Sequence, residues 1–413
     1  MSKFLGYRCT VCGHEYGPDE VTYQCPADGG NLDVLINYQR INKSIRPEQL
    51  FASPETSMWR YLPLLPVDDP GGLGTPLRAA GWTPTYKSAR LAERLGLEQL
   101  WIKDESSNPT ASFKDRASAL LVARAAEIEA AVIVTASTGN AGAALAGMAA
   151  AVGAKAVIFA PKTAPPAKIA QLLVFGAEVL LVDGSYDDAV ALSQQAAEEF
   201  GWYCRNTGYN PFTAEGKKTA AFEIWEQVLT QSKLSKPLCI FVSVGDGNII
   251  SGLHKGFRDL VALGWIERSP RIFGVQAEGS AAIANAFKAH TEEIQSVSAD
   301  TLADSISVDM PSDGLRALRA ATQTDGAYLT VSDEEILAAI PQLGAIGVFA
   351  EPAGATAFAG VQAALKSDLI MSEDPVLALN TGSGLKDVAA ARKAAGEARV
   401  IQPTLAALKE ALG

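Results

Sequence analysis

The chain has 413 residues, which is long enough for two or three domains with large apolar cores and excludes a small protein held together by disulfides. Hydrophobic residues make up 48% and charged residues 20%, as in globular proteins and unlike disordered or fibrous ones. The 46 Asp and Glu against 35 Lys and Arg give a net charge of −11, which argues against binding to nucleic acid or to an anionic membrane.

The first residues predict a small module, residues 1–36, that differs in composition from the rest of the chain. It holds three of the five cysteines, and their spacing is not that of a secreted disulfide framework. No long apolar run follows the N-terminus, so we expect no signal peptide and a cytoplasmic location.

The rest of the chain predicts an α/β architecture. The stretch 35–80 predicts a connecting region of short helices. From residue 99 onward, short β-branched runs alternate with Ala-rich helical patterns, which is typical of a parallel sheet. The predicted strands are 99–104, 131–136, 155–160, 178–183, 238–244, 271–277, 327–332 and 375–381.

Two of the intervening helices have clear boundaries. One begins at Ser185, which forms a capping-box pattern with Asp188, and another begins after Pro165 and Pro166 and ends at Gly176. The first is expected to present one apolar face, made of Ala189, Leu192, Ala196 and Phe200. The uncharged stretch 131–154 is long enough to cross a membrane, but polar residues in its middle predict a buried strand, a loop and a helix.

Several common mechanisms are not supported by the sequence. Only three histidines occur, so histidine-rich metal centres and Ser-His-Asp relays have few candidates. EGKKT at 215–219 fails as a P-loop, because Pro211 stands where glycine is needed and Lys218 where Ser or Thr is needed. The segment 243–252 lacks the third glycine of the dinucleotide fingerprint, so nicotinamide binding is not supported either.

Three polar loops follow predicted strands, at 136–142, 243–252 and 380–387. Parallel strands end at one edge of a sheet, where ligands bind. The glycine-rich loop at 243–252 suits a phosphate at a helix start, although a tight turn is the alternative. Lys114 precedes another predicted helix and is a candidate for a Schiff base with a carbonyl cofactor; an ordinary surface charge is the alternative.

Taken together, seven motifs resemble those of the fold-type II pyridoxal-phosphate enzymes of the tryptophan synthase β family, and within it those of threonine synthases. They are GWTPTYKS (81–88), NPTASFKDR (108–116), STGNAG (137–142), GAEVLLVDGSYDDA (176–189), EGKKTAAFEI (215–224), GDGNI (245–249) and TGSGLKD (381–387). The resemblance implies two three-layer α/β domains with mostly parallel sheets. The large, cofactor-binding domain is 37–114 and 215–413, and the small, mobile domain is 115–214.

The resemblance also implies how pyridoxal 5'-phosphate is bound. Lys114 is expected to carry the cofactor as a Schiff base and to act as the acid and base. Asn140 is expected to hydrogen-bond the phenolate oxygen, and Thr381 to face the pyridine nitrogen. The phosphate is expected to be bound mainly by backbone N–H groups of five consecutive residues: Gly245, Asp246, Gly247, Asn248 and Ile249. A non-catalytic protein would have no physical need to keep these residues together.

The implied substrate is a small amino acid, and the implied reaction converts O-phospho-L-homoserine and water to L-threonine and phosphate. Ser137, Thr138 and Lys168 are expected to bind the substrate, with plain N-capping as the alternative for the first two. The family also implies a homodimer.

One departure from the family bears on the substrate. Threonine synthases commonly have a basic residue where Thr213 stands, and there it can hold the substrate phosphate. Lys168, Lys217 and Arg116 are then the candidate phosphate partners. The alternative function is β-elimination or β-replacement on serine, threonine or a diamino acid.

The N-terminal cysteines have the spacing of the zinc ribbon that precedes many members of the family. Cys9, Cys12 and Cys25 match it, and Asp28 replaces the fourth cysteine. A carboxylate can bind zinc, so a structural zinc site of these four residues is expected, with His14 as a substitute ligand. A ribbon that folds without metal is the alternative.

Overall fold

The largest sheet of the computed structural model, which describes residues 3–413, has the strand order β12-β11-β10-β13-β5-β4. Its strands are β4 Thr85–Lys87, β5 Leu100–Asp104, β10 Cys239–Ser243, β11 Arg271–Ala277, β12 Tyr328–Val331 and β13 Val376–Asn380. All neighbours pair in parallel except β4 and β5. The five parallel strands were predicted, whereas the three-residue edge strand β4 was not.

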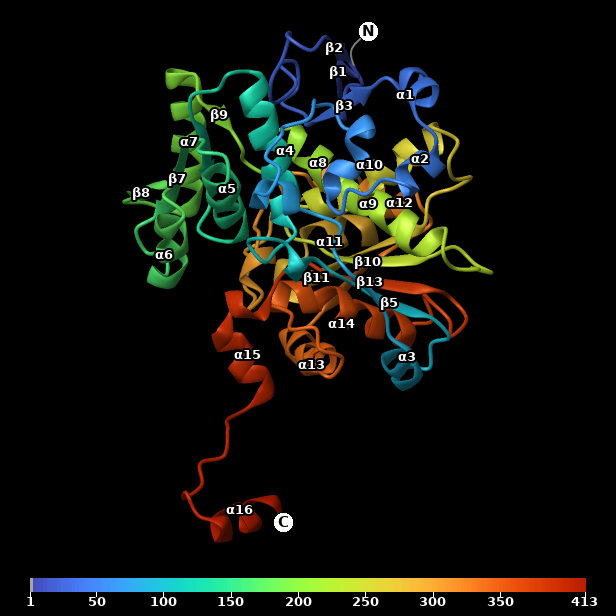
Figure 1. Ribbon diagram of the computed structural model, residues 1–413, viewed down its shortest axis with the longest axis vertical. Coiled ribbons are helices and arrows are strands. Elements are labelled where there is room, and N and C mark those ends of the chain that lie inside the picture. Colours follow the sequence, from blue (N-terminus) through green and yellow to red (C-terminus); the bar gives the residue numbers. More distant parts are fainter. Residues whose placement is uncertain (1–2) are drawn as a thin grey trace.

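Helices cover both faces of this sheet, which explains why its central strands are continuous apolar runs (Figure 1). One face carries α3 Ala89–Leu95, α13 Asp333–Gly344, α14 Pro352–Lys366 and α15 Val388–Ala395. The opposite face carries α9 Thr219–Ile224, α10 Asn248–Ala262, α11 Ala282–Lys288 and α12 Gly314–Thr322. The large sheet therefore forms the middle layer of a three-layer α/β unit.

A smaller, fully parallel sheet has the order β8-β7-β6-β9. Its strands are β6 Ile133–Ala136, β7 Ala156–Pro161, β8 Glu178–Val182 and β9 Tyr203–Cys204. The accompanying helices are α4 Lys114–Glu127, α5 Asn140–Ala150, α6 Pro166–Val174 and α7 Tyr186–Phe200, and α8 Phe212–Lys217 leads back to the large unit. The stretch 131–154 is therefore a strand, a loop and a helix, as predicted.

The capping box of α7 is present as predicted, with the Ser185 hydroxyl and the Asp188 side chain each accepting a backbone N–H. Its apolar face differs from the expectation. Ala189 and Ala196 are buried, but Leu192 is 41% exposed and Phe200 is 63% exposed. The helix packs on the sheet through small residues, which leaves the larger side chains at the rim of the contact.

The N-terminal residues form a three-stranded antiparallel sheet of β1 Phe4–Cys9, β2 Glu15–Tyr16 and β3 Leu32–Ile36. This sheet packs closely on the body: the Phe4 ring lies 5.5 Å from the Phe212 ring. Asp33 also pairs with the Arg316 guanidinium at 3.0 Å. The predicted module therefore shares its apolar core with the rest of the chain.

The connecting region consists of short helices, as predicted. It contains α1 Tyr38–Ser44 and α2 Pro47–Phe51, followed by two 3-10 helices, Met58–Leu64 and Pro76–Ala79. These segments carry the chain from the N-terminal sheet to β4.

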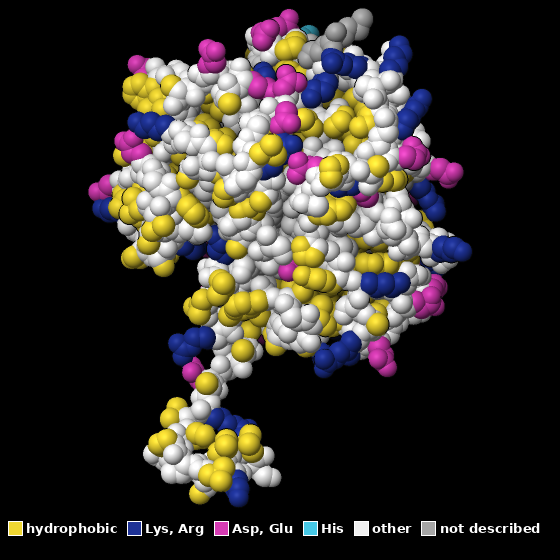
Figure 2. Space-filling model, viewed as in Figure 1, with side chains coloured by type: hydrophobic (Ala, Val, Ile, Leu, Met, Phe, Trp, Pro, Cys, Tyr) yellow, Lys and Arg dark blue, Asp and Glu magenta, His cyan; other side chains and the backbone are white. Residues whose placement is uncertain are grey.

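The C-terminal tail leaves the body and ends in α16, Leu405–Leu412 (Figure 1). None of the residues of α16 is buried, and apolar side chains of the tail stand clear of the body (Figure 2). No helix of residues 3–413 is long and apolar enough to cross a membrane.

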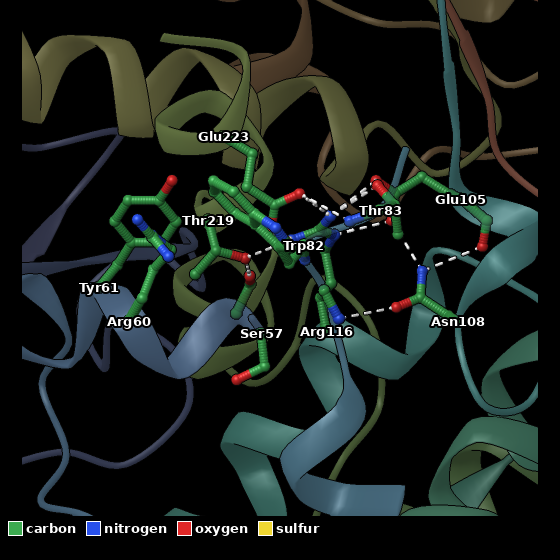
Figure 3. Close-up of polar contacts among 12 residues, drawn as sticks. Ser57, Arg60, Tyr61, Trp82, Thr83, Glu105, Asn108, Arg116, Thr219 and Glu223 are labelled. Atoms are coloured by element: carbon green, nitrogen blue, oxygen red, sulfur yellow. Dashed lines mark hydrogen bonds and ion pairs between the residues drawn. The ribbon is translucent and has the colours of Figure 1, made fainter. Parts of the chain in front are cut away.

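A buried ion network around Arg116 joins three segments of the chain (Figure 3). The Arg116 guanidinium donates to Glu105 at 2.7 Å and to Glu223 at 2.8 Å. Thr83 donates its hydroxyl to Glu105 at 2.7 Å, and Lys103 pairs with Glu223 at 2.9 Å. Burial by itself raises the pKa of Glu223, but the two cations outweigh it and lower the pKa to about 2.

We predict that Arg116→Met destabilises the fold, because it leaves two buried carboxylates with too little positive charge. The expected loss is about 3–5 kcal/mol of unfolding free energy, measured by urea denaturation at pH 7. Arg8→Met is the matched control, since Arg8 and Glu15 form an exposed pair whose loss should cost less than about 1 kcal/mol. Equal effects of the two substitutions would contradict a structural role for the network.

Candidate functional site

Lys114 is the first residue of α4, and its side chain lines an inner cavity between the two α/β units. The helix start is held by Asp115, whose carboxylate accepts hydrogen bonds from the backbone N–H and the hydroxyl of Thr110. Burial lowers the pKa of Lys114 and Arg205 lowers it further, against the opposing field of Glu351. A lowered pKa increases the share of the neutral amine, the form that acts as a nucleophile or a base.

Backbone hydrogen bonds bring distant loops together beside Lys114. The Phe113 N–H donates to the Thr381 carbonyl at 2.9 Å, and the Glu351 N–H donates to the Gly382 carbonyl at 3.1 Å. Thr381 lies at the carboxyl end of β13 and lines the same inner cavity as Lys114. The structure thus joins two of the predicted cofactor residues in one wall.

The glycine-rich loop after β10 forms the opposite end of the inner cavity, and all of residues 245–249 line it. It leads into α10, which no side chain caps. Gly247 has φ +89°, and a Cβ there would lie 2.8 Å from the Asp313 carbonyl oxygen. Lys217 donates to the Asn248 side chain at 2.6 Å beside this loop. A helix N-terminus and a lysine together suit a phosphate group.

Asn140 lies at the start of α5 and lines a second cavity, next to the inner one, that also contains Glu351. Its Nδ2 donates to Glu351 Oε1 at 2.8 Å, which leaves a second N–H for another acceptor. Burial raises the pKa of Glu351 to about 7, although Lys114 and Asn140 both oppose the shift. Glu351 is therefore a buried carboxyl group that gains and loses a proton near neutral pH.

An outer cavity adjoins the inner one, and the two share Ser305, Glu351 and Ala353. Thr138 and Lys168, both predicted to bind the substrate, line the outer cavity. The hydroxyl of Ser137, the third predicted residue, accepts the Gly139 N–H at 3.3 Å in a turn before α5, whose N-cap is Gly139 and which no side chain caps.

Two contacts cross the mouth of the outer cavity. Lys168 on α6 pairs with Asp304 at 2.5 Å, and Gln171 on the same helix accepts a hydrogen bond from Lys386 at 3.0 Å. Both contacts join the small α/β unit to the large one. All four side chains line the outer cavity, so the two contacts link the units at that cavity.

The two lysines of EGKKT have different surroundings. Lys218 is fully buried and pairs with Glu215 at 2.6 Å and Asp259 at 2.7 Å, away from the cavity. Lys217 instead lines the inner cavity. Arg116 was also a candidate phosphate partner, but all three of its guanidinium nitrogens are hydrogen-bonded within the buried network. Of the three candidates, Lys217 and Lys168 remain.

Glu351 and Arg205 were missed by the sequence interpretation. Glu351 precedes Pro352 at the start of a buried helix, and an acidic residue at such an end is a signal that could have been used. Arg205 directly follows the short strand β9, and nothing in its local pattern distinguishes it from a surface charge.

The N-terminal cysteines form one cluster with Asp28. The ligand atoms of Cys9, Cys12, Cys25 and Asp28 all lie within 4.8 Å of one another, and His14 is not part of this group. Cys12 Sγ and Cys25 Sγ are 3.8 Å apart, and Cys9 Sγ is 3.3 Å from Asp28 Oδ1. Two sulfurs bound to a tetrahedral zinc at ~2.3 Å lie about 3.8 Å apart.

Comparisons with known proteins agree with this geometry. The profile of the family described as "Pyridoxal-phosphate dependent enzyme" matches residues 77–382. Threonine synthases of Methanocaldococcus jannaschii and Methanosarcina acetivorans are each 36% identical to this chain, over 98% of both sequences.

Solved structures show the same fold. Threonine deaminase isoform 2 of Solanum lycopersicum superposes with a TM-score of 0.66 at 24% identity and covers 78% of this chain and 90% of its own. Diaminopropionate ammonia lyase of Escherichia coli gives 0.64 at 21% identity and covers 76% and 86%. At these identities the likeness concerns the fold alone.

We predict that Glu351→Gln changes how stability depends on pH. The folded pKa of Glu351, about 7, lies above the ordinary value near 4.3, so the folded protein binds the extra proton between these pH values. Its contribution to stability therefore falls as pH rises through this window. The glutamine variant should be more stable than the wild type at pH 8 by about 1–3 kcal/mol, with little difference at pH 4.5.

Urea denaturation across this pH range measures the effect. Glu198→Gln, at an exposed position of α7, is the control and should leave the curve unchanged. Parallel curves for wild type and Glu351→Gln would show that Glu351 does not titrate in this way.

Proposed function

Because the chain belongs to the family of pyridoxal-phosphate-dependent enzymes, we propose that it is a lyase that converts O-phospho-L-homoserine and water to L-threonine and phosphate. The observation that carries this proposal is the similarity to threonine synthases over nearly the whole length of the chain. A β-elimination or β-replacement on serine, threonine or a diamino acid is the alternative outcome of the same test.

The inner cavity fits pyridoxal phosphate. A Cβ at Gly245 would lie 2.8 Å from Ile306 Cα, so the loop is bare backbone that can approach a phosphate closely. The buried hydroxyl of Ser243 has no hydrogen-bond partner and lines the same cavity. Lys114 would hold the cofactor covalently, residues 245–249 with Lys217 would bind its phosphate, and Thr381 would face its pyridine nitrogen.

The chain's own residues then handle protons and orientation. When bound, pyridoxal phosphate supplies an electron sink for the α-carbon of the substrate. The Lys114 amine, whose pKa is lowered mainly by burial, accepts the α-proton and later returns protons to the carbon chain. Asn140 would orient the cofactor by donating its second N–H to it. Thr138 and Lys168, which line the outer cavity, would bind the substrate.

We propose that the small unit, residues 115–214, moves relative to the large one during turnover. The contacts Lys168–Asp304 and Lys386–Gln171 would open to admit the substrate and close to keep water out until the hydroxyl group is added. The family resemblance further supports a homodimer and a cytoplasmic location as parts of this proposal. The molar mass in solution, measured by light scattering, should be twice that of the chain if the dimer forms.

We also propose that Cys9, Cys12, Cys25 and Asp28 bind one zinc ion. The grouping of their ligand atoms within 4.8 Å of one another supports this. The Val11 N–H and the Tyr16 hydroxyl, which lie 3.3 Å from Cys9 Sγ and 3.0 Å from Cys25 Sγ, also support it. Four protein ligands leave no open position, so the ion would have a structural role.

We predict that the purified protein releases phosphate from O-phosphohomoserine and that Lys114→Ala removes this activity. The variant loses both the covalent attachment and the base, so the rate should fall by about 10³-fold or more, together with the visible absorbance of the bound cofactor. Lys155→Ala is the control, because Lys155 forms an exposed pair with Glu178. Release of ammonia and a 2-oxo acid instead of phosphate would select the alternative reaction.

We predict that the wild-type protein contains about one zinc ion per chain, measured by atomic emission. The double variant Asp28→Ala, Cys12→Ser should contain almost none. Loss of the metal should lower Tm by roughly 5 °C or more, because the ion holds the N-terminal sheet together. Lys114→Ala should keep its zinc. A wild-type chain without zinc that shows the same Tm would favour the ribbon that folds without metal.

A further inference from the structure

Eight lysine and arginine side chains are buried in the described part of the chain, and most of them contact a carboxylate. The paired ones are Arg60, Lys103, Arg116, Lys218, Lys255 and Arg316. Within residues 3–413, Arg205 and Lys217 have no carboxylate within ion-pair distance. A buried cation without a counter-ion is costly, and burial lowers the pKa of both side chains. A bound anion would favour the charged form at both positions.

Arg205 is held in place on two of its three nitrogens. Its Nε donates to Ser118 Oγ at 3.2 Å and its Nη1 to Thr207 Oγ1 at 2.7 Å, whereas Nη2 is buried without a partner. Thr207 lines the inner cavity. The side chain is thus fixed by neutral hydroxyl groups, and one edge of the guanidinium stays free for a ligand.

The two side chains stand differently toward the inner cavity: Lys217 lines it, whereas Arg205 contacts Thr207, which lines it. Lys217 lies beside the glycine-rich loop of the large unit, where the phosphate of the cofactor is proposed to bind. Arg205 comes from the end of β9 in the small sheet, where its N–H donates to the Val134 carbonyl at 2.7 Å. Arg205 is also close enough to Lys114 to lower the pKa of its amine. Because Thr207 lines the same cavity as Lys114, an anion bound by Arg205 beside Thr207 would lie at the cavity that contains the reacting amine.

We propose that Arg205 binds the phosphoryl group of the substrate and thereby determines specificity for a phosphorylated amino acid. This inference rests on the proposed function. Thr213 provides no charge for this purpose, because it is fully buried and donates its hydroxyl to the Asn210 carbonyl at 2.7 Å. A guanidinium with a free edge suits a phosphate better than a point charge does.

The same contact assists the departure of the leaving group. A proton leaves the β-carbon for the Lys114 amine, and the electron pair of that C–H bond forms a double bond between the β- and γ-carbons. The bond between the γ-carbon and the ester oxygen breaks at the same time, and its electron pair stays on that oxygen. The departing phosphate carries one additional negative charge until a proton joins it. Arg205 stabilises this charge in a water-poor site, where a fixed cation has its largest effect.

Arg205→Met in the holoenzyme tests the proposal. We expect kcat/KM for O-phosphohomoserine to fall by about 10- to 100-fold, as for the loss of a charge-assisted hydrogen bond. The inhibition constant of inorganic phosphate should rise by a similar factor. The Kd of pyridoxal phosphate should change by less than about threefold, which distinguishes the substrate phosphate from that of the cofactor. Arg392→Met, at an exposed position of α15, should change none of these values.

Ser118→Ala provides a second variant in which Arg205 is kept. It removes one of the hydroxyls that orient the guanidinium, at a position that does not line the cavity, so we expect a rise in KM with an unchanged Kd for the cofactor. If Arg205→Met does not fold, the KM and the cofactor Kd of Ser118→Ala test the proposal by themselves. Unchanged KM and phosphate inhibition in either folded variant, or a change confined to cofactor affinity, would overturn the proposal.

Failure of the proposed function gives a different result. If the wild type releases no phosphate from O-phosphohomoserine, the stabilisation of the protein by inorganic phosphate still tests Arg205. A rise in Tm with phosphate that is present in the wild type and absent in Arg205→Met supports an anion site at Arg205. An equal rise in both overturns it.

Discussion

The double ion pair of Arg116 with Glu105 and Glu223 is the interaction on which the arrangement of the cavity depends. It joins the start of α4 to the end of β5 and to α9, and Lys114 lies two residues before Arg116 on the same helix. Because all of these groups are buried, any shift of one segment would leave a charge without its partner. The position of the reactive amine is therefore set by charges that do not touch the ligand.

Buried charges in this protein fall into two groups with different surroundings. Those remote from the cavity are neutralised within the fold, as Lys218 is by Glu215 and Asp259. Lys217, which lines the inner cavity, and Arg205, which contacts the lining residue Thr207, have only neutral partners. The adjacent lysines of one motif thus differ in role: Lys218 is neutralised within the core, whereas Lys217 is available to a ligand in the cavity.

The parts of the site that could be predicted from the sequence are those set by local chain geometry. The loop 245–249 and Thr381 follow β10 and β13, which are neighbouring parallel strands, so strand pairing alone brings them to one edge of the large sheet. Asn140 follows β6 of the small sheet and reaches this region only because the two units pack together. Glu351 and Arg205 depend on partners far away in the chain, such as Asn140 and Ser118. Helical periodicity likewise could not show that Leu192 and Phe200 extend beyond the edge of the small sheet. The partners of Glu351 and Arg205, and the exposure of Leu192 and Phe200, are determined only when separate segments of the chain pack together.

The unpaired cations also affect the protein before it has bound anything. A fold that encloses positive charge without its counter-ion is less stable empty than filled, and binding of an anion shifts the folding equilibrium towards the native state. Empty molecules unfold more often and are more exposed to proteases. The cofactor phosphate and any further anion therefore act as parts of the folded structure as well as ligands, because the chain reaches its full stability only when they are bound.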